Sequence, residues 1–186
     1  MTTATYIVDS SGDDGYIKGT TMNITSQYLI VGIDGTQDSH RCSIWTRFVT
    51  TIPQGSVINN ATMKYYFKAS DGVTVKARFE AVDADNPGKP TTSTDLSVRT
   101  TANVTISNVP SSGDYTSPDI KTIIQELVDR TGFGGTMITM LSDNNTSTDN
   151  TKRYYQSWDD AGTNPPELYV DYTPPTTFIP HCLNVI

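Results

Sequence analysis

The chain has 186 residues, a net charge of −7 and a hydrophobic content of 35%, which suits one globular domain with a polar outer face. The negative charge argues against a nucleic-acid partner and against a polybasic membrane contact, because phosphates would be repelled. The sequence holds no apolar run long enough to span a bilayer, and residues 1–12 lack the basic start and apolar core of a signal peptide.

Short strand-like runs separated by turn residues fill the first half of the chain. The sequence predicts five strands here, over residues 5–9, 27–34, 41–53, 56–70 and 73–83. Asp71-Gly72 separates the last two, and this dipeptide is typical of a tight hairpin turn. We therefore expect these two strands to pair with each other. The side chains expected on one face of the second strand are Val73, Val75, Ala77 and Phe79.

A single helix is predicted in the second half, because apolar residues recur there at helical spacing. These residues are Ile120, Ile123, Ile124, Leu127 and Val128. Ser117 is the expected N-cap, Pro118 suits the first turn, and Asp119 suits the positive end of the helix. Gly132 is expected to end it.

The remaining segments predict further strands. Two short ones are expected within residues 96–99 and 103–107, and three longer ones over 136–141, 152–158 and 166–173. Pro174-Pro175 stops the last strand. About ten strands and one helix predict an all-β fold, an antiparallel jelly-roll-like β-sandwich with the helix closing one end. We expect one domain over 1–173 and an extended apolar C-terminal tail over 174–186.

Several motifs in order give the chain a resemblance to a known family. They are Leu-Ile-Val-Gly, Arg47-Phe48, Ile-Pro-Gln-Gly followed by an Ala-Thr-Met-Lys-Tyr-Tyr strand, the helix before Gly-Phe-Gly-Gly, and Pro-Pro-Glu-Leu-Tyr-Val-Asp-Tyr. Over residues 5–173 the chain resembles DNRLRE-type β-sandwich modules, which are similar to carbohydrate-binding modules. It departs from them at Met63, where the family usually has Leu, and at Leu127, where members have Trp.

This resemblance implies a fold and two possible roles. Such modules occur in bacterial surface proteins, which implies a carbohydrate-binding or adhesion module that recognises surface glycans. They also occur in phage virion proteins. A module that stands alone without a signal peptide favours the second role, a virion subunit assembled in a host cytoplasm.

No catalytic group is expected. His40 sits in a turn and His181 in the tail, so neither is predicted to lie in a packed cleft beside a nucleophile. Acidic residues that could form a glycosidase pair are Asp159, Asp160, Glu167, Glu80 and Asp83. Asp159 and Asp160 are adjacent and would point to opposite faces of a strand. We therefore expect a protein that is not an enzyme.

Two acidic loops are candidates for Ca²⁺, which prefers oxygen ligands. The first offers Asp83, Asp85 and Asn86. The second offers Asp143, Asn144, Asn145, Asp149 and Asn150. Neither has the spacing of an EF-hand, and a solvated turn is the alternative for both. No other cofactor is expected.

Aromatic side chains are the candidates for contacts with glycans. Tyr154, Tyr155 and Trp158 lie on one predicted strand, which also carries Arg153 and Gln156. Exposed aromatic rings can stack on sugars while charged neighbours bind hydroxyls, but strand alternation turns only some of these residues outward. Packing in the β-core is the alternative.

The tail supplies the candidate contacts with a partner. Its apolar residues are Phe178, Ile179, Leu183, Val185 and Ile186. An extended apolar segment behind Pro-Pro can dock in a groove or add a strand to a neighbour's sheet edge. It can also pack on its own domain.

The chain has two cysteines, Cys42 and Cys182, too few for a disulfide framework. They are either two free thiols or one bridge that ties the tail to the body. The resemblance, together with the missing signal peptide and the missing catalytic group, implies a structural virion protein of a tailed phage, in the capsid, neck or tail. Its expected partners are other virion proteins or copies of itself; glycan recognition is the alternative.

Overall fold

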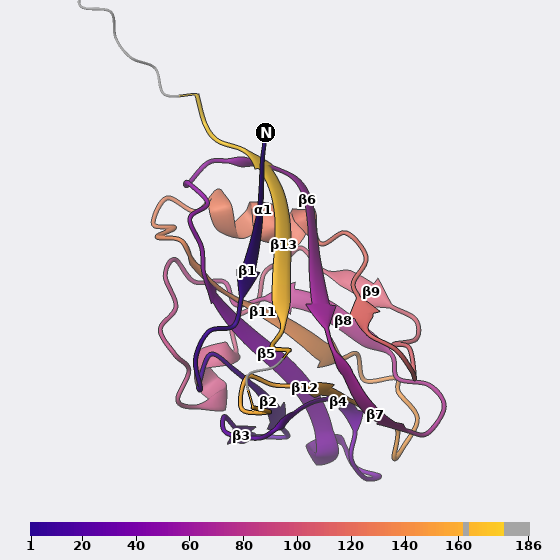
Figure 1. The fold of residues 1–186 in the computed structure, drawn as a ribbon. Helices are drawn as coiled ribbons and strands as arrows, with labels where there is room; N and C mark the ends of the chain where they lie inside the picture. Colours follow the sequence, from indigo (N-terminus) through magenta and orange to yellow (C-terminus); the bar gives the residue numbers. More distant parts are fainter. Residues whose placement is uncertain (162–163, 177–186) are drawn as a thin grey trace, which may run out of the picture.

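The computed structural model describes residues 1–161 and 164–176, which form two packed antiparallel sheets (Figure 1). The smaller sheet has the strand order β1-β13-β6-β10. These strands are β1 (Thr2–Ile7), β13 (Glu167–Thr173), β6 (Val57–Tyr65) and β10 (Tyr115–Thr116). The last long strand ends at Thr173, as the sequence predicts.

The larger sheet has the order β7-β12-β4-β5-β11-β8-β9, and β2 joins β5 and β3 beside this path. Its central strands are β12 (Lys152–Gln156), β4 (Tyr28–Ile33), β5 (Arg41–Val49), β11 (Thr136–Asp143) and β8 (Ala77–Ala81). The others are β7 (Phe67–Asp71), β9 (Val104–Ile106), β2 (Asp14–Lys18) and β3 (Thr21–Asn23). The fold is the predicted antiparallel, jelly-roll-like β-sandwich.

The helical elements are short. The α-helix α1 spans Lys121–Val128, and two 3-10 turns span η1 (Asp38–His40) and η2 (Ser93–Leu96). Figure 1 shows α1 at the end of the sandwich where β13 finishes. None of the helices in the described ranges has the length and apolar character needed to cross a membrane.

The main core lies between the two sheets and is rich in aromatic rings. Tyr65 on β6 and Tyr155 on β12 are fully buried with ring centroids 5.4 Å apart, and Phe79 on β8 stacks on Tyr65 at 6.4 Å. Leu168 and Val170 of β13 fill the same layer from the small sheet. Alternation along each strand sends every second side chain into this layer, which explains the burial pattern of β6 and β13.

A smaller core covers the outer face of the large sheet. Trp45 on β5 and Met140 on β11 are fully buried there against Leu96 of η2 and Val82. The segment between β8 and β9 therefore lies over the large sheet as a cover. The prediction of a strand within 96–99 is wrong, because Leu96 ends a 3-10 turn and only Arg99 forms a β-bridge, to Val82. The strand expected within 103–107 is confirmed as β9.

The predicted hairpin around Asp71-Gly72 is wrong. Residues 56–70 are divided between the two sheets, as β6 and β7, and β7 pairs with β12. After the turn, β8 pairs with β11 and β9. Val73 is 81% exposed, whereas Val75, Ala77 and Phe79 are buried as expected.

A buried arginine explains this turn. Arg153 on β12 is fully buried, and its guanidinium donates hydrogen bonds to the main-chain oxygens of Asp71 (3.2 Å) and Val73 (2.9 Å). It also donates to those of Val109 and Pro110, both at 3.0 Å, and to that of Lys152 at 3.1 Å. The carbonyls of Asp71 and Val73, which flank Gly72, thus accept from a side chain on β12. The chain then continues to β8, near the opposite edge of the same sheet.

The helix begins later than predicted because its expected cap is used elsewhere. The main-chain N–H of Met63 donates to the Ser117 hydroxyl (2.9 Å), so Ser117 pairs with β6. Asp119 accepts from the N–H groups of Lys121 (2.9 Å) and Ala61 (3.0 Å). The expectation that Gly132 ends the helix is also wrong, since α1 ends at Val128.

Replacing Arg153 with Met should destabilise the protein by about 3 to 5 kcal/mol, because several buried carbonyls would lose their donors. Replacing Arg130, which lies in ion pairs about one-third exposed or more, should cost under about 1 kcal/mol. Urea unfolding of both variants and the parent chain measures the difference. Equal, small losses in the two variants would contradict the role given to Arg153.

Candidate functional site

The predicted glycan-binding residues divide between the inside and the outside of the sheet. The side chains of β12 alternate strictly between the two faces of the sheet. Arg153 and Tyr155 therefore point inward, and both are fully buried. For these two residues the structure shows the alternative, packing in the β-core. Trp158 is partly buried and packs against the main core. Tyr154 remains as the residue of this group that faces outward on β12.

Tyr154 forms an aromatic pair with a residue from the neighbouring strand. Tyr28, at the start of β4, is 40% exposed and meets Tyr154 edge to face, with ring centroids 6.0 Å apart. Lys68 on β7 holds its ammonium 5.6 Å from the centroid of Tyr28. With Ala69, these side chains line an open hollow of about 390 Å³, which we call the tyrosine hollow.

Charged side chains fix the rim of the tyrosine hollow. The Tyr154 hydroxyl donates to a carboxylate oxygen of Asp71 at 3.0 Å. Lys152 binds Asp34 and lies 3.6 Å from Asp71. Hydrogen bonds from Lys152 and Lys18 hold the pKa of Asp34 down at about 2. The hollow therefore presents two aromatic rings beside groups that can donate to and accept from hydroxyls.

Sequence reasoning missed Tyr28. It is the first residue of a strand whose remaining residues are all buried, so β4 carries no alternation that would mark an outward position. Its position opposite Gln156 follows only from the pairing of β4 with β12. The pairing of distant strands is therefore what creates the site.

The first predicted calcium loop is engaged by an arginine. Asp83 and Asp85 both form ion pairs with Arg130, and the Arg130–Asp85 contact is 2.7 Å. Asn86 lies beside Gly134. Two of the three predicted oxygen ligands thus already neutralise a cation.

The second loop is similarly occupied. Asp143 binds Arg41, and the Asn144 side chain accepts from the main chain and hydroxyl of Thr146. In the part of the chain that the structure describes, no group of three or more His, Cys, Asp or Glu side chains could hold a metal ion.

The carboxylates considered for glycosidase chemistry lie in separate interactions. Glu80 accepts from Arg99 and Arg78, Asp160 from Lys68 at 2.5 Å, and Glu167 from the Tyr66 hydroxyl at 2.6 Å. Asp159 has one carboxylate oxygen buried without a hydrogen-bond partner. Glu80, Asp160 and Glu167 are thus each held in a separate structural contact, and Glu80 is buried.

Asp14 is a buried carboxylate that the sequence did not mark. One oxygen accepts from the Trp158 main-chain N–H at 2.8 Å, and the other is buried without a partner. Burial, with smaller contributions from Asp159 and Asp13, raises the pKa of Asp14 to about 7. Near neutral pH this side chain therefore carries its charge only part of the time.

Several predicted residues lie outside the described ranges. They are Phe178, Ile179, His181, Cys182, Leu183, Val185 and Ile186. The question of a bridge between Cys42 and Cys182 therefore lies outside the described residues. Cys42 is a buried thiol, and burial raises its pKa to about 11. His40 closes η1 and precedes β5.

Comparisons with known proteins add no relative. No protein-family model matches the chain, and the curated proteins include no similar sequence. The resemblance to DNRLRE-type modules thus stays a hypothesis drawn from the residue motifs.

Proposed function

We propose that the protein is a non-enzymatic structural subunit of a virion, which docks onto copies of itself or onto other virion proteins. The observation that supports this most is the open edge of β1 in the small sheet. Unpaired strand edges present a row of free N–H and C=O groups to any strand that approaches. Such an edge is the usual place for strand addition between proteins.

The opposite edge of the same sheet is thoroughly covered. Beyond the two residue pairs with β10, β6 is completed by side chains: Gln125 of α1 accepts from the Ile58 N–H (2.7 Å). Asp119 accepts from the Ala61 N–H, and Ser117 exchanges two hydrogen bonds with Met63. The main-chain N–H groups of Ile58, Ala61 and Met63 thus have side-chain partners from residues 117–125, more than fifty positions later in the chain.

Strand β1 lacks such a cover. Among the described residues its main chain forms a ladder only with β13, from Thr2–Tyr172 to Ile7–Glu167. Its sequence, Thr-Thr-Ala-Thr-Tyr-Ile, has none of the Lys, Pro or bulges that commonly protect an edge. A six-residue edge in which all residues but Ala4 are β-branched or aromatic suits pairing with an added strand.

The apolar segment emerges beside this edge. Because Thr2 pairs with Tyr172, the end of β13 lies next to the start of β1, and Figure 1 shows both at the same end of the sandwich. The apolar residues 178–186 follow Pro174-Pro175. We propose that this segment pairs with β1 of a neighbouring copy. The virion itself is proposed from the resemblance to phage modules.

A concentrated sample of the full chain should form oligomers, and a chain ending at Thr176 should be a monomer, because the added strand would be lost. Thr5→Lys, on the open edge, should weaken association about tenfold or more by placing a charge there. Thr62→Lys is the matched control, since Thr5 and Thr62 flank Tyr169 on the same face. Light-scattering mass measures all four. A full chain that stays monomeric at high concentration would contradict docking between copies.

Glycan binding is a second candidate, and the tyrosine hollow is the observation that favours it. Two outward tyrosines with a lysine and a hydrogen-bonded aspartate offer both a stacking surface and polar partners. The hollow lies on the large sheet, so it would stay accessible in an assembly formed through β1.

On a glycan array followed by titration of the best ligand, Tyr154→Ala should weaken binding about tenfold or more, because an aromatic contact would be removed. Tyr169→Ala is the control, since Tyr169 is 39% exposed but lies on the small sheet. An array with no ligand at millimolar concentration, or equal losses in the two variants, would argue against glycan binding at this hollow.

A further inference from the structure

Two acidic side chains approach each other at the end of the sandwich away from α1. Asp14, the first residue of β2, is 1% exposed. Asp159 lies in residues 157–161, which follow β12 of the large sheet and lead toward β13 of the small one. Figure 1 shows β2 and the start of β13 at this end. A contact between the two side chains therefore ties the connection between the sheets to β2.

A hydrogen bond brings these two residues together. The main-chain N–H of Trp158 donates to Oδ2 of Asp14 at 2.8 Å, so the next residue, Asp159, lies beside the same carboxyl group. The pKa of Asp14 is raised to about 7, mainly by burial and in part by the negative charge of Asp159, while the Trp158 N–H acts in the opposite direction. The two carboxyl groups are thus close enough to influence each other's charge.

Each carboxyl group also has an oxygen that lacks a donor. Oδ1 of Asp14 and Oδ2 of Asp159 are both buried, and neither has a hydrogen-bond partner among the residues that the structure describes. A buried carboxylate oxygen that has lost water and gained no donor is costly, and two neighbouring negative charges add to the cost. One proton changes this balance, because a protonated carboxyl group has an O–H that a neighbouring carboxylate can accept. The pair is therefore satisfied with one shared proton and unsatisfied with none.

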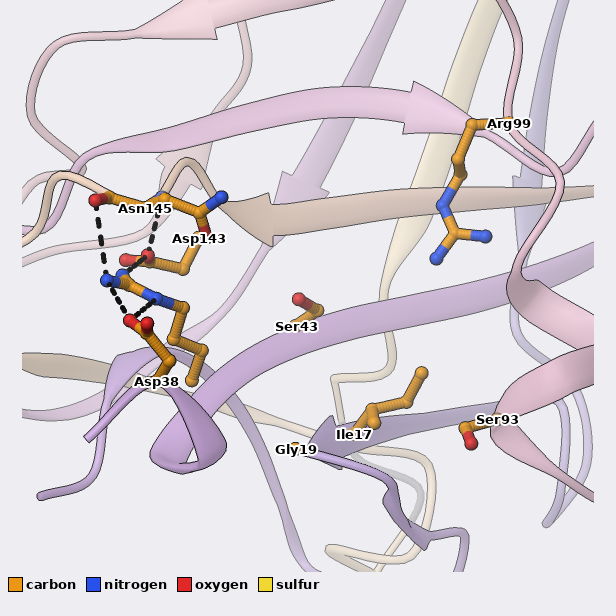
Figure 2. A pocket seen from close by; sticks show the side chains of 9 residues that line it. Ile17, Gly19, Asp38, Ser43, Ser93, Arg99, Asp143 and Asn145 are labelled. Atoms are coloured by element: carbon orange, nitrogen blue, oxygen red, sulfur yellow. Dashed lines mark hydrogen bonds and ion pairs between the residues drawn. The ribbon is translucent and has the colours of Figure 1, made fainter.

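A cation could supply the missing donor, as it does for another buried carboxylate of the large sheet. Figure 2 shows Asp143 and Asp38 joined by hydrogen bonds to one guanidinium, that of Arg41, which also reaches the main-chain oxygen of Asn145. Asp14 has no comparable partner, since no Lys, Arg or His within the described ranges forms an ion pair with it. A proton is therefore the remaining means of balancing its charge.

The other charged and titratable groups around Asp14 do not alter this conclusion. Asp13, its neighbour in the chain, is held by Arg47 of β5 at 2.8 Å and by Lys89 at 3.4 Å, so both cations are directed to Asp13. From β6, the phenol of Tyr65 faces Asp14, and burial raises the pKa of this phenol above its usual value. Tyr65 is thus neutral at any pH at which Asp14 titrates.

We propose that Asp14 and Asp159 share one proton and form a pH-sensitive clasp, which holds the connection between β12 and β13 on β2 in acid and releases it above neutral pH. The clasp does not depend on the docking edge proposed above. Its opening also changes the tyrosine hollow, because Asp160 of the same segment binds Lys68, which lines the hollow.

The direction of the pH effect follows from how tightly the closed clasp holds its proton. An exposed aspartate has a pKa near 3.8, whereas the pKa of Asp14 in the closed clasp is about 7. The clasp is therefore most stable in acid, and this contribution is lost as the pH rises through about 7. The Ser157 hydroxyl donates to the main-chain oxygen of Ser26 at 2.6 Å. This contact has no titratable group, so the opening is confined to residues 158–161.

Two measurements on the full chain test the clasp. In carbon-13 NMR of the side-chain carboxyl groups, Asp14 should titrate with a midpoint near 7. Hydrogen exchange of the Trp158 amide, corrected for the intrinsic effect of pH on exchange, should become at least about tenfold faster from roughly pH 5.5 to 8.5, because the loss of the proton favours the open form. A midpoint below about 5, in the range of ordinary aspartates, or a corrected rate that does not change with pH would overturn the proposal.

Asp14→Asn keeps the shape of the side chain and supplies a permanent N–H donor to Asp159, so the corrected exchange rate of the Trp158 amide should stay slow over the same pH range. Asp95→Asn is the matched control: Asp95 also accepts from main-chain N–H groups, but in η2, and this variant should keep the pH dependence of the parent chain.

Asp159→Asn tests the pair from its other side, and it serves if the Asp14 variant unfolds. Its amide can donate to the ionised Asp14, so the midpoint of Asp14 should fall by about one pH unit. Either a pH dependence in Asp14→Asn that equals that of the parent chain, or an unchanged Asp14 midpoint in Asp159→Asn, would overturn the shared proton.

Discussion

The constraint on which the whole sandwich depends is that main-chain polar groups must keep hydrogen-bond partners where strands end or sheets stop. In this protein side chains often replace a missing strand. Arg153 binds five carbonyls around β7 and β12, and Gln125, with Asp119, completes β6. Glu126 of α1 likewise accepts from the N–H groups of Thr101 and Ala102. Within residues 1–161 and 164–176, strand β1 is a long edge that receives no such cover.

The same constraint explains what the sequence could and could not predict. Strands such as β6 and β13 alternate between apolar and polar residues, and the helix carries a 3.6-residue period, so their existence followed from local pattern. The turn at Asp71-Gly72 has the right residues for a hairpin, but its carbonyls bind Arg153, some eighty residues later in the chain. Ser117 has the right residue type for a cap, but it pairs with Met63. These two errors came from tertiary hydrogen bonds that no local pattern contains.

Candidate sites were harder to predict than strands for a related reason. Tyr154 could be identified as a candidate because its strand alternates, whereas Tyr28 precedes a run of buried residues and gains its partner only through the pairing of β4 with β12. Asp14 lies outside the predicted strands and was not identified as a candidate. Its unpaired oxygen depends on the approach of Trp158 and Asp159, which follow β12. Charge balance of this kind is a property of the folded protein.

The proposed functions use different surfaces. The open edge belongs to the small sheet, while the tyrosine hollow lies on the large sheet, as the strand assignment of Tyr154 requires. A subunit that assembles through β1 would therefore keep the tyrosine hollow open to solvent. This separation is consistent with a structural protein that also recognises small polar ligands.

Hydrogen exchange of the β1 segment, residues 2–7, tests the central claim most directly. The full chain would be compared at dilute and at concentrated conditions by mass spectrometry. If β1 is the docking edge, its outward amides exchange quickly in the dilute sample and become protected in the concentrated one, while buried strands such as β11 change little. Exchange of β1 at the same rate in both samples would contradict the account.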